Sequence, residues 1–346
     1  MFSRLVAIDR SSMRWGTAAM VLSAIAVCVA LEALIGVGFV QAAVAAVVVT
    51  LSGGRGEIRS RLGNMAVMTV VGGLLGLIAY VSAEEAWLAG LVLAIATYLT
   101  GLAYGVSRAA GGRGYLLLCW VLAVLIGQSR DEYPAATSVA FLVGGAVAIV
   151  LVVLVALVTR ERAPALAAPR PVSEAPDRRT GLGELVRSDL GVWNAVRSVL
   201  ILVAVVIGYS LTTELDPYWA AIVLLIVFLP DLGQTMFKAA QRGAGTAAGV
   251  LTATGLISAF EADAPIVVVM AISTFGAVAF YSANYLIYAF LLTNAVLTYY
   301  WLAVDHEMSA PVIRIVDTLV GVILAIGGAG LVALVTRRRA VDPGTR

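Results

Sequence analysis

Charge is scarce in this 346-residue chain, and that scarcity decides the class of protein. Asp, Glu, Lys and Arg make up only 13% of the residues, whereas 61% are hydrophobic and the mean hydropathy is +0.98. Soluble domains hold about 25% charged residues and ~45–50% apolar ones. Several apolar runs approach or exceed the ~20 residues that cross a bilayer. The composition therefore excludes a soluble domain and predicts an all-α polytopic membrane protein that lies in a lipid bilayer.

Cysteine and histidine are almost absent, which removes most sites of catalysis and metal binding. Cys28 and Cys119 both lie in apolar runs, so we interpret them as buried apolar side chains rather than a disulfide or a metal pair. The single histidine, His306, has only carboxylates as sequence neighbours, and no P-loop occurs. We expect no enzyme, no metal and no cofactor, and any transport must be passive or driven by an ion gradient.

Lysine is nearly missing as well, since Lys238 is the one lysine among 23 basic residues. The net charge of +2 is not gathered on one basic face, so nucleic acid is not an expected partner. The arginine bias, together with much Ala, Val and Gly, favours a bacterial source with a GC-rich genome.

Apolar runs divide the chain into about twelve transmembrane helices. Polar or Gly/Pro-containing segments separate the runs. The runs at 36–51, 115–127 and 218–229 are short against the ~20 residues that span a bilayer or lie close to a neighbouring run. The predicted spans are 15–34, 36–51, 62–81, 87–106, 115–127, 135–159, 192–211, 218–229, 244–260, 265–283, 285–302 and 311–336.

The distribution of basic residues predicts the orientation. If the N-terminus is cytoplasmic and the spans alternate, cytoplasmic segments hold 21 of the 23 Arg and Lys residues, and only Arg130 and Arg314 fall elsewhere. The outer loops then hold mostly acids. The positive-inside rule predicts this arginine asymmetry. We expect a multi-pass protein of the bacterial plasma membrane with both termini in the cytoplasm and an uncleaved first span.

The two halves of the chain are an internal duplication. Residues 142–162 and 319–339 are identical at 13 of 21 positions without a gap. Six spans per half is an even number, so we expect two parallel six-helix repeats related by an axis along the membrane normal. The predicted units are an N-terminal repeat at 1–160, a Pro- and Arg-rich cytoplasmic linker at 161–189, and a C-terminal repeat at 190–346.

Each half contains a short, interrupted span. In the second half the run 218–229 stops at Pro230, and a basic amphipathic segment leads to a small-residue helix near Gly245. In the first half the corresponding break is at 52–54. Interrupted spans at matching places in two repeats are the best sequence pointer to the substrate site of a transporter.

Three residues define the second break. Pro230 removes a backbone donor and ends a helix, and Gly233 permits an unusual backbone turn. Asp231 can cap the following segment through its carboxylate, or it can carry a coupling proton. The cap is the favoured interpretation.

The segment from Tyr218 to Gly249 resembles the signature of the fusaric acid resistance family. The matching residues are Tyr218-Trp219-Ala220, Pro230-Asp231-x-Gly233-x-Thr235 and Arg242-x-x-Gly245-Thr246-x-x-Gly249. That family includes bacterial exporters of aromatic carboxylic acids and is similar to the plant aluminium-activated malate channels. The resemblance implies a membrane transporter that effluxes organic anions. The larger exporters carry sizeable cytoplasmic domains that this chain lacks, so the resemblance names neither the substrate nor a partner protein.

The motif supplies candidate ligands for an anion. Arg242 and the Thr246 hydroxyl are predicted to hold it, with Lys238 on the same helix face and Thr235 at helical spacing. Helix N-termini at the break add free N–H groups and a partial positive charge. The alternative interpretation is that Lys238 and Arg242 only mark the cytoplasmic boundary.

Three residues outside the motif complete the predicted site, namely Arg197, Tyr288 and Asn294. Arg197 either faces the pathway or snorkels to the cytoplasmic interface. Tyr288 either stacks on an aromatic substrate or belongs to the interfacial belt. Asn294 is a buried amide that needs partners, and therefore a candidate for the cavity. Arg314 and Asp317 are expected to form a local ion pair, with an external gate as the alternative.

The sequence thus predicts export of small organic anions, with aromatic carboxylates as the first class to consider, driven by the proton gradient. A passive anion channel, which needs no titratable group, is one alternative. A non-transporting membrane scaffold is another, and a homo-oligomer is left open.

Overall fold

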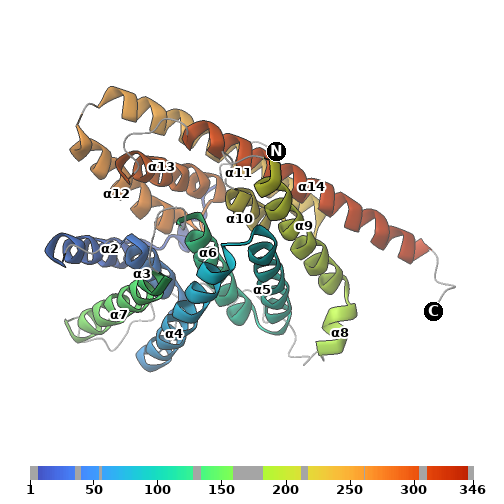
Figure 1. The fold of residues 1–346 in the computed structure, drawn as a ribbon, viewed down its shortest axis with the longest axis horizontal. Coiled ribbons are helices and arrows are strands. Elements are labelled where there is room, and N and C mark those ends of the chain that lie inside the picture. The colour runs from blue at the N-terminus through green and yellow to red at the C-terminus, as the bar shows by residue number, and fades with distance from the viewer. Residues whose placement is uncertain are drawn as a thin grey trace.

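A computed structural model describes residues 7–35, 40–53, 57–127, 134–158, 182–211, 217–260, 262–303 and 310–341, and these residues are helical with no strand among them (Figure 1). A 3-10 helix, η1 (Arg10–Ser12), precedes the bundle. The first half contains α2 (Trp15–Ile35), α3 (Val40–Ser52), α4 (Ile58–Ser82), α5 (Ala86–Val106), α6 (Arg108–Gly127) and α7 (Pro134–Val158). The second contains α9 (Asp189–Leu211), α10 (Pro217–Val227), α11 (Leu232–Ala259), α12 (Asp263–Phe280), α13 (Tyr285–Ala303) and α14 (Ala310–Val341).

Each predicted span coincides with one of these helices, so the all-α prediction is confirmed. Seven helices are long and apolar enough to cross a membrane within the ranges described, namely α4, α5, α7, α9, α12, α13 and α14. Parts of α2, α3, α6 and α10 are apolar but shorter. The chain is therefore a multi-pass membrane protein, and the count of twelve crossings remains a prediction. Within the predicted linker, the short helix α8 (Leu182–Arg187) packs against α5 and α9.

The start of α11 differs from the prediction. We expected the helix to begin at Ala244, after a separate basic segment, but a single helix of 28 residues runs from Leu232 to Ala259. Neither Gly243 nor Gly245 interrupts it, because a glycine costs an α-helix only ~1 kcal/mol when packing supports the helix. As a consequence, Lys238 and Arg242 lie inside the helix. The first half has the same feature, since α4 begins at Ile58 and includes Arg59 and Arg61.

Equivalent helices make equivalent contacts in the two halves. In the first half α7 packs against both α3 and α4, and in the second half α14 packs against both α10 and α11. Similarly, α6 packs on α4 and α5, and α13 packs on α11 and α12. In Figure 1, α14 runs along one edge of the molecule and ends near the C-terminus, away from the other helices.

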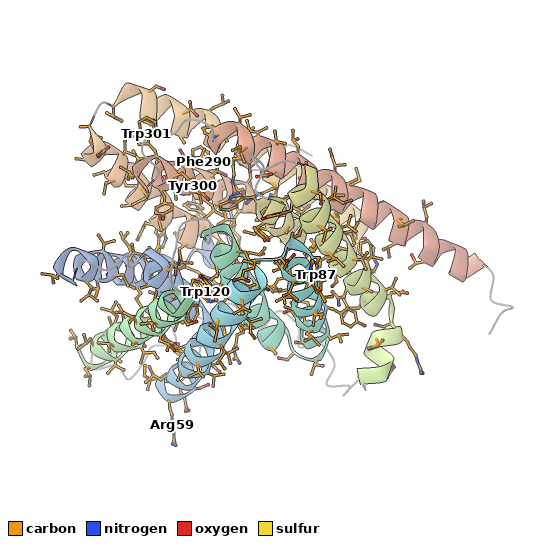
Figure 2. All side chains as sticks on the ribbon, viewed as in Figure 1. Arg59, Trp87, Trp120, Phe290, Tyr300 and Trp301 are labelled. Atoms are coloured by element: carbon orange, nitrogen blue, oxygen red, sulfur yellow. The ribbon has the colours of Figure 1, made fainter. Side chains whose placement is uncertain are left out.

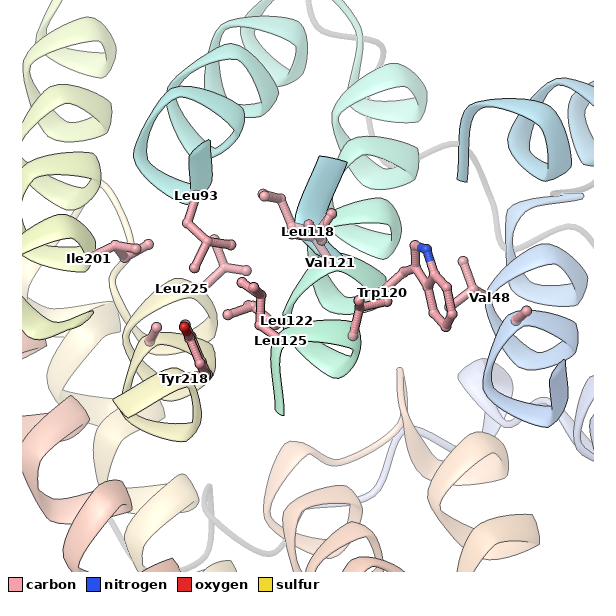
Figure 3. Close-up of a cluster of buried hydrophobic side chains, with 14 of the residues drawn as sticks. Val48, Leu93, Leu118, Trp120, Val121, Leu122, Leu125, Ile201, Tyr218 and Leu225 are labelled. Atoms are coloured by element: carbon pink, nitrogen blue, oxygen red, sulfur yellow. The ribbon is translucent and has the colours of Figure 1, made fainter. Parts of the chain in front are cut away.

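One hydrophobic core joins the two halves through α6. Leu118, Leu122 and Leu125 of α6 lie opposite Tyr218 and Leu225 of α10 (Figure 3). On its other side, α6 directs Trp120 toward α3, as Figure 3 also shows. The Trp120 indole N–H donates to the carbonyl of Gly72 at 2.9 Å, so even this large core residue leaves no buried donor unsatisfied. Further contacts between the halves join α5 to α9 and α2 to α12.

Glycines bring helix backbones together at the predicted small-residue motifs. A Cβ atom on Gly245 would lie 2.6 Å from the Leu286 carbonyl oxygen, and one on Gly249 would lie 2.8 Å from the Phe290 carbonyl oxygen. Helices α11 and α13 therefore touch backbone to backbone. In the first half Gly72 makes a different contact, because its Cβ would overlap the side-chain ring of Phe141 at 2.1 Å.

The N-terminal segment is fastened to the turn between α12 and α13. The Asn284 side-chain amide donates to the Ala7 carbonyl at 2.9 Å, and the Asp9 backbone N–H donates to the Ala283 carbonyl at 3.1 Å. The Asp9 carboxylate accepts hydrogen bonds from the hydroxyls of Ser11 and Ser12, which lower its pKa. This turn leads directly into the first residues of α13, which face the candidate site.

Candidate functional site

The break between α10 and α11 is a folded element held by Thr235. Residues Phe228 to Asp231 are not helical, as Pro230 predicted. The Thr235 hydroxyl donates to the Leu229 carbonyl and accepts from the Leu229 backbone N–H, both at 3.0 Å. The side chain is fully buried. Both hydrogen-bonding functions of Thr235 therefore serve the break, and the structure gives it no role toward a ligand.

Asp231 is the N-cap of α11, as favoured from the sequence. Its backbone is extended and its carboxylate accepts from the Gln234 backbone N–H at 2.7 Å. The side chain is exposed. An exposed carboxylate that satisfies a free N–H group of the first turn is stabilised as a cap, and water can reach its remaining lone pairs.

The predicted turn at Gly233 is wrong. Gly233 is the second residue of α11, and its φ does not lie in the left-handed region. A Cβ at this position would meet only the Asp231 carboxylate, at 3.3 Å. Asp231 provides the extended residue that ends the break, so the helix can begin at once and needs no glycine conformation.

The capping role leads to a prediction at Asp231. Asp231→Asn should leave transport and stability almost unchanged because asparagine caps helices as well as aspartate does, whereas Asp231→Ala should cost ~1 kcal/mol. Thermal unfolding and vesicle flux of both variants would check this. Loss of flux in Asp231→Asn with unchanged stability would contradict the capping role and indicate that the carboxylate carries a proton.

A cavity of about 480 Å³ opens at the break. Its lining comes from the end of the break and from one face of the first turns of α11, namely Leu229, Asp231, Gly233, Gln234, Phe237, Lys238 and Gln241. The lining includes the polar residues Asp231, Gln234, Lys238 and Gln241, and Gln241 precedes Arg242 in the helix. Among the predicted site residues, Asp231, Gly233 and Lys238 share this cavity.

Arg242 is a buried cation in the middle of a helix. Its side chain is fully buried, and it lies ten residues into α11, or ~15 Å along the axis. None of its three guanidinium nitrogens makes a well-formed hydrogen bond within the described residues, although the Tyr285 hydroxyl lies beside the group. A buried charge without a counter-ion costs several kcal/mol. Arg242 therefore does not simply mark a helix end at the membrane surface.

Two tyrosines of α13, Tyr285 and Tyr288, lie within electrostatic range of this cation. The ring centroids of Tyr285 and Tyr288 are 5.7 Å apart, and those of Tyr281 and Tyr288 are 5.2 Å apart. Tyr285 and Tyr288 both interact electrostatically with Arg242. The Lys238 amine lies 4.9 Å from the centre of the Tyr285 ring, so it links the cavity to the tyrosines. Tyr288, a predicted site residue, thus lies within electrostatic range of Arg242, and its contact with a substrate stays a prediction.

Two buried polar side chains further along α11 and α13, Thr246 and Asn294, each have an oxygen without a hydrogen-bond partner in the described part of the chain. Thr246 is one turn further along α11, is 1% exposed, and its hydroxyl has no hydrogen-bond partner in the described part of the chain. Asn294 on α13 donates its amide N–H to the Phe290 carbonyl at 3.1 Å, and its side-chain oxygen lacks a donor there. Thr246 can thus act together with Arg242, while Asn294 lies about two turns beyond Tyr288 on α13.

Sequence reasoning did not assign Arg314 to the site, but the structure brings it there. Its guanidinium lies 3.7 Å from the centre of the Trp219 ring and interacts electrostatically with Tyr285. It is 3% exposed. The sequence did contain a signal for Arg314. In the predicted orientation only two basic residues lie outside the cytoplasmic segments, and Arg314 is one of them, inside an apolar span. The Tyr218-Trp219 pair of the motif gave no indication of its cationic neighbour on α14.

Arg197 lies where α9 meets α5 and α6, away from Arg242. It donates to the Tyr115 hydroxyl of α6 and, at 2.9 Å, to the side-chain oxygen of Asn194. Asn194 in turn packs on Gly101 of α5, where a Cβ would lie 2.2 Å from its side-chain oxygen. The side chain of Arg197 is 4% exposed, so it does not snorkel. It holds α9 against α5 and α6, and no contact joins it to Arg242 in the described structure.

The first half reaches the site through α6. The Cys119 thiol lies within electrostatic range of Tyr281, Tyr285 and Tyr288. The first-half break contributes Ser52 and Gly53, which pack within their own half; Gly53 lies against Met65. The remaining predicted break residue, Gly54, lies outside the described residues. The described residues contain no cluster of His, Cys, Asp or Glu that could hold a metal.

The comparison with known families gives one match. Residues 200–327 match the family model described as fusaric acid resistance protein-like, which confirms the resemblance seen in the motif. The matched region contains the break, Arg242, the tyrosines and Arg314. Neither a curated protein nor a solved structure matches the chain.

Proposed function

We propose that the chain is an efflux transporter that exports small organic anions through a site centred on Arg242. The match of residues 200–327 to the fusaric acid resistance protein-like family supports this proposal. The observation that carries this proposal is the fully buried guanidinium of Arg242, which makes no well-formed hydrogen bond within the described residues. A cation at membrane depth is expensive, so it is retained where an anion binds it. No enzyme function enters the proposal.

Aromatic carboxylates are the substrate class that we propose. Arg242 and the Thr246 hydroxyl can hold a carboxylate, because a guanidinium donates two parallel hydrogen bonds to that group. The rings of Tyr285 and Tyr288 flank the same position and present apolar faces and edges to an aromatic ring. Lys238 in the cavity at the break attracts the anion on its way to Arg242.

The transport architecture follows the sequence prediction. We propose twelve crossings in two parallel repeats, supported by the matched contacts of α7 and α14 with their neighbours. With both termini in the cytoplasm of a bacterium, the break opens to the cytoplasm and Arg314 lies toward the outside. The proton gradient provides the drive, and its electrical part alone is worth ~2.3 kcal/mol per 100 mV for one anionic charge that moves outward.

Uptake into everted membrane vesicles is the experiment that tests this function. Labelled benzoate and a small panel of other aromatic carboxylates would be offered with and without an imposed pH gradient, and with the membrane potential set separately. We expect uptake that requires the protein and is stimulated by the gradient. Uptake that follows voltage alone would favour a passive channel instead. No flux with any member of the panel would favour the scaffold alternative.

A further inference from the structure

Arg197 is a buried cation at the contact between the two halves of the chain. It lies about two turns after Asp189, the first residue of α9, and is only 4% exposed. Its guanidinium donates to the side-chain oxygen of Asn194 at 2.9 Å and to the hydroxyl of Tyr115. Both of these hydrogen-bond partners are neutral. A buried guanidinium whose bonded partners are all neutral keeps its whole charge, and that charge is costly to bury.

Hydrogen-bond donors that lack an acceptor gather around this guanidinium. The Nε atom of Arg197 and the side-chain amide nitrogen of Asn194 have no hydrogen-bond partner in the described part of the chain. The same holds for the hydroxyl of Thr97 on α5, which is 1% exposed. The Tyr115 hydroxyl accepts from Arg197, so its own proton can still be donated. Three helices therefore supply four donors to one buried positive charge.

The packing of α5 on α9 brings Thr97 to the level of Arg197. The two helices lie side by side in antiparallel directions, since the start of α5 meets the second half of α9, and Gly101, near the end of α5, meets Asn194 (Figure 1). Thr97 is one turn before Gly101, and Arg197 is nearly one turn after Asn194. In an antiparallel pair these two steps go the same way along the contact, so both side chains lie in the same layer.

Close helix contacts limit the size of a ligand at this point. A Cβ atom on Gly101 would lie 2.2 Å from the Asn194 side-chain oxygen, and one on Gly114 of α6 would lie 2.8 Å from the Thr100 methyl group. Helix α5 therefore approaches both α9 and α6 closely, which leaves no space for an aromatic ring between them. A monatomic halide is the anion that suits so small a space, and N–H and O–H donors beside a positive charge are the groups that hold an anion.

We infer that Arg197, Asn194, Thr97 and Tyr115 form a chloride site between the two halves. The ion accepts hydrogen bonds from the unused donors and neutralises the guanidinium. Thr97 and Tyr115 belong to the first half and the other two residues to the second, so the bound ion fastens the halves to each other. A buried water molecule is the competing occupant. Water must also donate, however, and the Asn194 oxygen already accepts from Arg197.

Thermal unfolding of the purified protein is the first test. Melting temperatures would be compared in sodium chloride, sodium bromide and sodium gluconate at equal ionic strength. A ligand that binds only the folded protein stabilises it, so we expect chloride and bromide at about 100 mM to raise the melting temperature by ~3 °C relative to gluconate. Equal melting temperatures in the three salts would overturn the inference and leave water as the occupant.

Two variants test the proposed ligands of the ion. Arg197→Met should abolish the difference between chloride and gluconate. Thr97→Val keeps the shape of the side chain and removes one donor, so it should weaken chloride binding about fivefold. The matched control Arg59→Met removes an exposed cation and should respond to chloride as the wild type does. If Arg197→Met does not fold, Thr97→Val decides, and an unchanged chloride affinity in that variant speaks against the site.

A separate measurement locates the ion, because Arg242 is also a buried cation that attracts anions. The chloride effect should persist in Arg242→Met. Its loss there, together with its retention in Arg197→Met, would assign the ion to the proposed transport site and contradict the inference. Crystals grown in bromide should show anomalous scattering beside Arg197, between α5 and α9. The inference does not depend on export, so a failure to transport benzoate would leave the chloride site unaffected.

Discussion

Replacement of Arg242 by Met should abolish anion uptake into everted vesicles and, at the same time, raise the thermal stability of the protein. The two effects have one cause. The guanidinium is fully buried, and neither a hydrogen bond nor a carboxylate partner satisfies it in the described part of the chain. Its burial therefore opposes folding, and an apolar side chain of similar length removes that cost. We expect the melting temperature to rise by ~3 °C or more.

The loss of transport should be large. A charged hydrogen-bonding residue at the centre of a buried site typically contributes ~2 kcal/mol or more to binding, so uptake at low substrate concentration should fall at least ~30-fold. Arg242→Lys should keep the stability cost and recover part of the uptake, because a lysine retains the charge but not the paired donors. Arg59→Met is the matched control, since Arg59 is exposed at the end of α4 and points away from the helices in Figure 2. Unchanged uptake in Arg242→Met would contradict the proposed site.

A methyl group at Gly245 should destabilise the protein more than the same group at any exposed glycine of α11. The new Cβ would lie 2.6 Å from the Leu286 carbonyl oxygen and 2.8 Å from the Ala289 Cβ. Neither atom belongs to a flexible side-chain end, so α11 and α13 must separate. We expect Gly245→Ala to cost ~1–3 kcal/mol, as overpacking does elsewhere.

Gly243 provides the control within the same helix. A Cβ there would meet no atom within 4 Å, so Gly243→Ala should gain the ~1 kcal/mol by which alanine exceeds glycine in a helix. Thermal unfolding in detergent, followed by size-exclusion chromatography of the heated samples, would compare the two. Equal melting temperatures for both variants would show that α11 and α13 are not in backbone contact.

The sequence predicted the positions of the helices better than it predicted which side chains contact one another. Apolar length and the Pro230 break placed a helix at each predicted run, because these features depend on local composition. The start of α11 was missed because Lys238 and Arg242 suggested a surface segment, and only the contact with α13 explains why a polar stretch remains helical and buried. Thr235 was predicted to bind the ligand because its hydroxyl lies beside the break and can donate to an anion. In the structure this hydroxyl instead forms hydrogen bonds with Leu229 in the break.

Residues on distant spans were the hardest to predict. Arg242, Thr246 and Lys238 share one helix, so their spacing alone placed them together. Arg314, by contrast, approaches Trp219 from a helix about ninety-five positions later in the chain, and no local pattern encodes that distance. For Arg197 the sequence suggested a role that the structure does not give it. Its depth in the span suggested a residue of the transport pathway, but its hydrogen bonds go to Tyr115 of α6 and to Asn194 of its own helix.

The glycine contacts between α11 and α13 also limit how the protein can change shape. Two helices whose backbones touch have no side-chain layer to slide over, so they move as a single rigid body. The arginine of α11 and the tyrosines of α13 therefore keep one spacing throughout a transport cycle, and the size of molecule they accept is constant. Any rocking motion must take place at other helix contacts, where side chains rather than backbones meet.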